Sequence, residues 1–119
     1  MNAIKMKAMK QPKVTKVPFY DLEIVRFLIK DGSDLDIAYA YEDLVFSEHG
    51  LFILQFIGES SQSFACWFNK DCIESDRINI FNSLTKTSTL NGLELEYKGK
   101  FELYQKEDCD EIDIHFEKV

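Results

Sequence analysis

Positive charge is missing from the middle of this sequence: residues 31–69 hold seven acids and no lysine or arginine. Turn and linker residues are also scarce, with two prolines and five glycines among 119 residues, so long flexible linkers are not expected. The longest apolar run, Leu51 to Ile57, is interrupted by Gln55 and is too short to cross a bilayer. The basic start is not followed by the apolar segment of a signal peptide. These absences predict a cytoplasmic protein.

Cysteine is scarce as well. Cys66, Cys72 and Cys109 are an odd number without a close pair, which favours free thiols in a reducing compartment over a disulfide framework. The gap between Cys66 and Cys72 is wider than the spacing of a zinc clip. The acid run 107–113 lacks the central glycine and alternating ligands of a calcium loop and is predicted to be a solvated loop. The sequence therefore predicts no metal and no cofactor.

The composition is that of a folded domain. Hydrophobic residues make up 45% of the chain and aromatic residues 13%, and disordered chains lack such aromatic content. The length fits one domain. Residues 1–18 contain five lysines and no acid, and they are predicted to be a basic N-terminal arm or an edge strand. The arm is favoured because Met and Lys are poor strand formers. Residues 19–119 are predicted to form a single α+β domain.

The remaining charge is strongly acidic. The net charge of the chain is −7, although its first 18 residues are basic. A body this acidic repels nucleic-acid phosphates and anionic membranes, so neither is a predicted partner. It attracts basic proteins through steering and charge complementarity. Solubility alone is an equally good explanation of a charge of this size.

Alternation of apolar and polar residues predicts most of the secondary structure. Leu22 to Lys30 fits either a short helix or a strand, and the turn signal of Asp31-Gly32 favours the strand. Leu51 to Ile57 is apolar on both faces and should be a central strand. Further strands are predicted at residues 35–41, 44–46, 64–69, 93–97, 101–104 and 112–117, with a turn or a bulge at Gly99.

One segment has helical spacing. Ile73, Ile80, Phe81 and Leu84 fall on one stripe together with Arg77, and Asn91-Gly92 marks the exit. Ser75 is the predicted N-cap. The predicted fold class is therefore α+β: a mainly antiparallel sheet of six to eight strands, strongly curved in one version, with one principal helix around residues 73–87 packed on it.

No catalytic constellation is visible. His49 lies in a turn and His115 on the polar face of the last strand, and no positioned partner for acid–base work is visible for either. The chain is therefore predicted not to be an enzyme. Two acidic surfaces are the candidate partner-binding sites. In the first, strict strand alternation places all the acids on one face around Tyr104: Glu94, Glu96, Glu102, Asp113 and Glu117. The second lies in the base-free segment: Asp34, Asp36, Glu42, Asp43 and Glu48.

These features favour a small acidic binding protein. The first hypothesis is an immunity or inhibitor protein that neutralises a basic toxin enzyme, such as a nuclease, because an acidic surface complements a phosphate-binding site. The alternatives are a secretion-chaperone-like protein that holds an effector segment, and a ligand-binding β-rich domain. The first alternative is expected to show a C-terminal amphipathic helix, which the sequence pattern lacks. The second requires an apolar cavity.

Overall fold

The computed structural model describes residues 2–7, 22–58, 62–105 and 111–119, of which residues 2–7 and 111 are described in their backbone only. These residues form seven strands, two α-helices and one short 3₁₀ turn. In chain order they are β1 (Asn2–Lys7), α1 (Leu22–Ser33), β2 (Ile37–Tyr41), β3 (Leu44–Ser47), η1 (Glu48–Gly50), β4 (Phe52–Phe56), β5 (Ser63–Asn69), α2 (Glu74–Leu90), β6 (Glu94–Gln105) and β7 (Glu111–Lys118).

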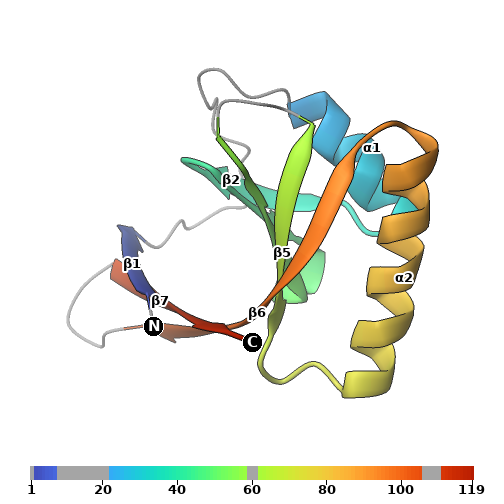
Figure 1. Ribbon diagram of the computed structural model, residues 1–119. Coiled ribbons are helices and arrows are strands. Elements are labelled where there is room, and N and C mark those ends of the chain that lie inside the picture. Colours follow the sequence, from blue (N-terminus) through green and yellow to red (C-terminus); the bar gives the residue numbers. More distant parts are fainter. Residues whose placement is uncertain (1, 8–21, 59–61, 106–110) are drawn as a thin grey trace.

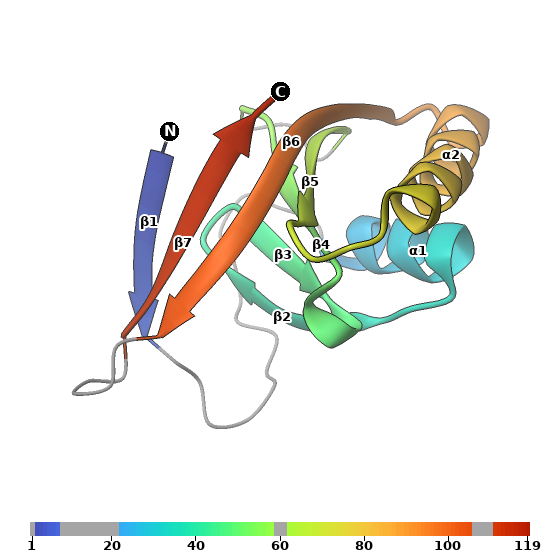
Figure 2. The same ribbon diagram turned by 90° about the horizontal axis from the view of Figure 1, so that it is seen from below.

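The strands form one curled sheet in the order β1-β7-β6-β5-β4-β3-β2. Neighbouring strands are antiparallel except β5 and β6, which are parallel because α2 carries the chain back between them. Both helices lie on one side of the sheet, and β1, β7 and the far end of β6 project away from them (Figures 1 and 2). The predicted α+β class and strand number are confirmed, and the described chain has a second helix beside the predicted one.

The second helix, α1, corrects the expected strand at Leu22 to Lys30. Val25, Leu28 and Ile29 are fully buried, which is the spacing of a helix face. Gly32 is not the corner of a hairpin. A Cβ atom built on it would lie 2.8 Å from Leu84 Cδ2 and 3.0 Å from Leu84 Cα, so this glycine lets α1 and α2 approach closely.

Helix α2 begins and ends close to the predicted bounds of 73–87. Leu84 is buried, and the guanidinium of Arg77 lies 4.7 Å from the centre of the Tyr97 ring, so the predicted stripe faces the sheet from Arg77 to Leu84. Its first predicted member, Ile73, precedes the helix and is 67% exposed. The predicted N-cap at Ser75 is wrong: Ile73 occupies that position and no side chain caps the helix. The predicted exit is confirmed, since Gly92 has a φ of +70° and the amide of Leu93 donates to the carbonyl of Ser88.

The sheet has a core on each face. On the outer face, which the helices cover in part, Phe52, Leu54 and Phe56 of β4 pack with α1 and α2. On the inner face, Phe46 of β3 and Phe116 of β7 belong to one cluster although they stand at opposite ends of the strand order, so the sheet is concave on this side. The prediction of a central strand covered on both sides is confirmed for β4, and Trp67 is 5% exposed, as expected for a core residue.

The edges of the sheet depart from simple alternation. β1 pairs with β7, so Asn2–Lys7 is an edge strand and not the favoured arm; the rest of the predicted 1–18 segment lies outside the described residues. In β2 a register shift between Ile37 and Tyr39 puts Ile37 and Ala40 on the buried side together.

No helix in the described part of the chain is long and apolar enough to span a membrane.

Candidate functional site

A bulge in β6 decides which acids share a face. Cys66 pairs with Tyr97 but the next residue, Trp67, pairs with Gly99, so Lys98 is an extra residue in β6. Beyond the bulge the alternation of side chains between the two faces is shifted by one residue. A position that would point to one face in an unbroken strand therefore points to the other. Gly99 is required at this point, because its φ is +149° and a Cβ atom would overlap the carbonyl oxygen of Glu117.

The prediction that five acids point to one side is therefore wrong. Glu94 and Glu96 lie before the bulge, on the inner face of the sheet. Glu102 follows the bulge, and the β6–β7 register puts it on the outer face with Asp113 and Glu117. The prediction assumed strict alternation from Glu94 to Glu102. One extra residue in the strand moves every later side chain to the opposite face.

The apolar residues change faces at the same point. Phe101, Ile114 and Phe116 are buried in the inner core, whereas Leu93 and Leu95 pack with the outer one. Alternation predicts seven core residues in these strands: Leu93, Leu95, Phe101, Leu103, Ile112, Ile114 and Phe116. Of these, Leu103 alone is exposed, at 38%.

The outer face beyond the bulge is a charged hollow of about 100 Å³. Its lining comes from the β5–α2 connection and from β6 and β7: Lys70, Lys100, Phe101, Glu102, Tyr104, His115 and Glu117. Lys70 Nζ lies 3.3 Å from Glu102 Oε2. The pKa of Glu102 is held below its usual range, first by a hydrogen bond from the Tyr104 hydroxyl and then by Lys70. These contacts favour the charged form of Glu102 on this surface.

Tyr104 is the exposed aromatic group of the outer face. It is 46% exposed, and its ring lies against that of His115 with 4.6 Å between the ring centres. Its hydroxyl donates to Glu102, which also raises the pKa of the tyrosine. The ring is therefore in contact with His115, and nearly half of its surface is open to solvent. Asp113 stands opposite Tyr104 in the register, but one of its carboxylate oxygens is buried without a hydrogen-bond partner, so it is the acid of this face least able to reach another molecule.

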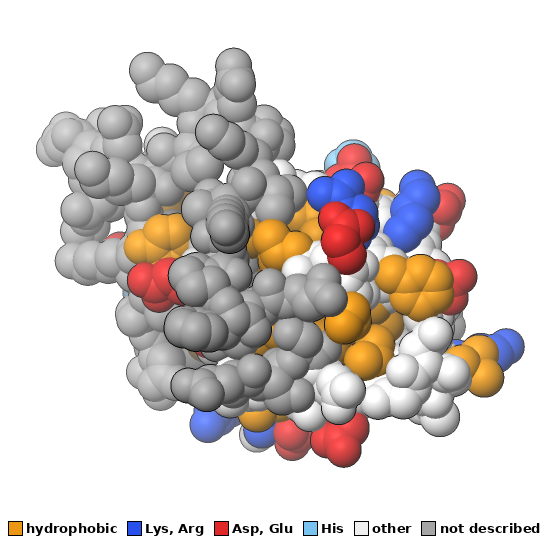
Figure 3. Space-filling model, turned by 90° about the horizontal axis from the view of Figure 1, so that it is seen from above, with side chains coloured by type: hydrophobic (Ala, Val, Ile, Leu, Met, Phe, Trp, Pro, Cys, Tyr) orange, Lys and Arg blue, Asp and Glu red, His pale blue; other side chains and the backbone are white. Residues whose placement is uncertain are grey.

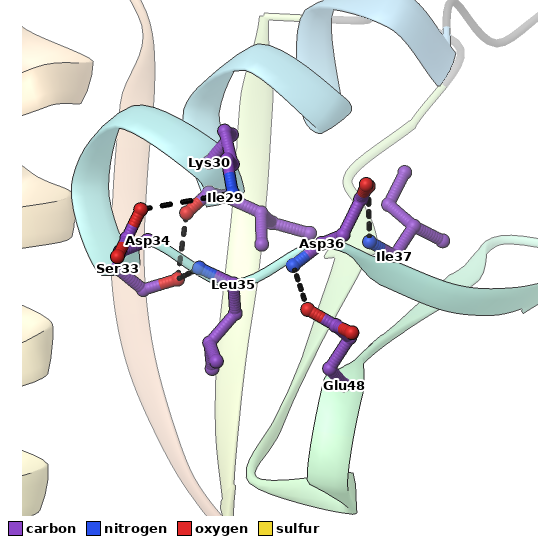
Figure 4. A network of polar contacts seen from close by, with 8 residues as sticks. All are labelled: Ile29, Lys30, Ser33, Asp34, Leu35, Asp36, Ile37 and Glu48. Atoms are coloured by element: carbon purple, nitrogen blue, oxygen red, sulfur yellow. Dashed lines mark hydrogen bonds and ion pairs between the residues drawn. The ribbon is translucent and has the colours of Figure 1, made fainter.

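The second predicted surface is largely used by the fold itself. Figure 4 shows the connection from α1 to β2, where Asp34 pairs with Lys30 at 3.6 Å and the amide of Asp36 donates to Glu48 Oε1 at 2.7 Å. Asp36 also pairs with Arg26 at 3.5 Å. Asp36 and Glu48 therefore compensate backbone and basic groups within the chain, which leaves them less free to bind a partner, whereas the side chain of Asp34 is 97% exposed.

The other two acids of that surface lie at the β2–β3 turn. Glu42 is exposed and has a φ of +54°, the left-handed conformation of a tight turn. Asp43 accepts a hydrogen bond of 2.9 Å from the side-chain amide of Gln55, and Gln55 accepts one of 3.1 Å from the Trp67 indole. Asp43 therefore continues a hydrogen-bonded chain into the inner face.

The inner face carries a larger hollow, of about 360 Å³. Ala65 lies in register between Gln55 and Glu96, and its short side chain leaves a space between these two residues, which we call the notch at Ala65. The hollow is lined by Gln55, Phe56, Ile57, Ala65, Trp67, Glu96, Lys98 and Lys118. Lys98 Nζ lies 3.2 Å from Glu96 Oε2, and Lys118 enters from the end of β7.

The remaining candidate residues are dispersed. His49 has a φ of +63° and is exposed in η1, whereas His115 lies in the outer hollow. Cys66 and Cys72 are free thiols, and Cys109 lies outside the described residues, as does most of the acid run 107–113. Within the described ranges, no group of three or more histidine, cysteine or acidic side chains is arranged to hold a metal.

Charge alone does not select a surface. On the side of the molecule drawn in Figure 3, acidic, basic and apolar side chains are interspersed over the described part. Sequence reasoning missed Lys70 and the notch at Ala65, since no pattern along the chain places either residue at a surface hollow. A comparison with protein-family models, one with curated proteins and one with solved structures each found no significant match to the chain.

Proposed function

We propose that this chain is a small acidic binding protein of the immunity or inhibitor type, which neutralises a basic enzyme such as a nuclease toxin by covering its active site. The observation that carries the proposal is the exposed Tyr104, held against His115 and bonded to Glu102 on a part of the sheet that the helices leave open. Tyrosine is enriched among the residues that dominate interface energies, and its ring supplies a large contact area at a low cost in conformational freedom.

The surrounding charges fit the same role. The lowered pKa of Glu102 favours its charged form, and Glu117 stands exposed on the neighbouring strand. The net charge of −7 increases the rate at which a basic partner is encountered. Lys70 pairs with Glu102, and Lys100 lines the same hollow. The two lysines offer positions for acids of a partner, so the face complements a partner surface that carries charges of both signs.

The bulge supplies a matched pair of variants. Glu102→Gln with Glu117→Gln removes two charges from the outer face, and Glu94→Gln with Glu96→Gln removes two from the inner face. Both double variants have the same net charge, so a difference between them reports the position of the interface and not general steering.

The test begins with recovery of the partner from the native cell, followed by association and dissociation kinetics over a series of salt concentrations. We expect the outer pair to slow association more than the inner pair, and Tyr104→Ala to cost at least about 2 kcal/mol, mainly as faster dissociation. The proposed interface is refuted if the rate constants of the partner are unchanged by salt, by both double variants and by Tyr104→Ala. An extended effector segment as the partner would favour the chaperone-like alternative.

A further inference from the structure

We infer that the hollow on the inner face is a binding site for a small aromatic carboxylate. It lies on the opposite side of the sheet from Tyr104 and is independent of the proposed function. Its volume of about 360 Å³ is within the range of small-molecule sites and leaves room for a ring with a short acidic chain. The outer hollow, at about 100 Å³, is too small for such a ligand.

The floor of the hollow suits a flat apolar group. Ala65 is 3% exposed and forms the low point between Gln55 and Glu96. Trp67 forms one wall, and it is held in place by its hydrogen bond to Gln55 and by Phe116, whose ring centre lies 4.6 Å away. A wall fixed in this way needs no rearrangement to accept a ring, which favours binding.

The charges at the mouth select the sign of the ligand. Two lysines and one glutamate stand there, and the glutamate is already paired with Lys98. Lys118 has no acidic partner among the described ion pairs, so its ammonium group is available to a ligand carboxylate. A cationic ligand would meet the two ammonium groups and would have to displace Lys98 from Glu96. Aromatic anions are therefore favoured over aromatic cations.

Phenylpropionate is a suitable probe, and Trp67 is a suitable reporter because it is the sole tryptophan of the chain. We expect saturable quenching or enhancement of Trp67 fluorescence by phenylpropionate, and weaker binding of its neutral amide. Lys118→Gln should weaken binding of the acid by up to about fivefold, the size of one solvent-exposed charge contact. Lys86→Gln, which removes the same charge from an exposed position on α2, should leave it unchanged.

Two further variants separate this site from adsorption elsewhere. Glu96→Gln should tighten binding, because the carboxylate that competes for Lys98 is removed, whereas Ala65→Leu should abolish it by filling the notch. The two charge variants test the site even if Ala65→Leu fails to fold. The inference is overturned if phenylpropionate does not bind, if the amide binds equally well, or if Lys118→Gln and Lys86→Gln have the same effect.

Discussion

Gly99→Ala is the substitution that tests the organisation of β6 most directly. The φ of +149° at this position is unfavourable for any residue with a Cβ atom and costs about 1–3 kcal/mol. The added methyl group would also overlap the carbonyl oxygen of Glu117, with the Lys118 Cα at 3.0 Å. The sheet can relieve this overlap by giving up about two β6–β7 hydrogen bonds, at about 1 kcal/mol each. We therefore expect a loss of about 3–5 kcal/mol in the free energy of unfolding.

Gly92→Ala is the matched control. Gly92 also has a positive φ, +70°, but no atom lies within 4 Å of a Cβ built on it. Its substitution should cost only the left-handed conformation, about 1–2 kcal/mol. Urea unfolding followed by Trp67 fluorescence measures both variants, and Trp67 pairs with Gly99 in the register. If Gly99→Ala is no more destabilising than Gly92→Ala, then β6 is not bulged as described and the assignment of acids to faces is wrong.

Three further predictions concern other parts of the molecule. Gly32→Ala should lower the free energy of unfolding by about 1–2 kcal/mol, since overpacking against Leu84 exceeds the gain in helix propensity, and the loss should shrink in a Leu84→Ala background; a stabilised protein would contradict the close helix crossing. In thiol titration Cys72 should react in the native protein and Cys66 only after denaturation, because burial raises the pKa of Cys66 and shields its sulfur. The lowered pKa of Glu102 means that its contacts stabilise the folded state above the ordinary carboxyl range and are lost as pH falls through the lowered value. An NMR titration midpoint for Glu102 at or above that of ordinary glutamates would rule this out.

The sequence predicted the parts of the fold that depend on local pattern. The apolar run of β4, the alternation of β5 and β7 and the helical stripe of α2 were recognisable because each pattern is carried by neighbouring residues of one segment. The strand expected at Leu22 to Lys30 failed for a different reason. Asp31-Gly32 has the composition of a turn, but the glycine is needed for contact with Leu84, a residue far away in the sequence. When a residue is required by a contact with a distant part of the chain, its role cannot be predicted from the residues next to it in the sequence.

The candidate sites depend on the one feature that alternation cannot place. Gly99 marked a turn or a bulge in the sequence, and these alternatives have opposite consequences. A turn would have ended the strand, whereas the bulge keeps β6 continuous and moves Glu102 to the face opposite Glu94 and Glu96. Because of this bulge, Tyr104 lies on the outer face of the sheet and the notch at Ala65 lies on the inner face. Each face of the sheet consequently has its own set of charges, so variants of Glu102 and Glu117 test a protein partner outside and a variant of Lys118 tests a small anion inside.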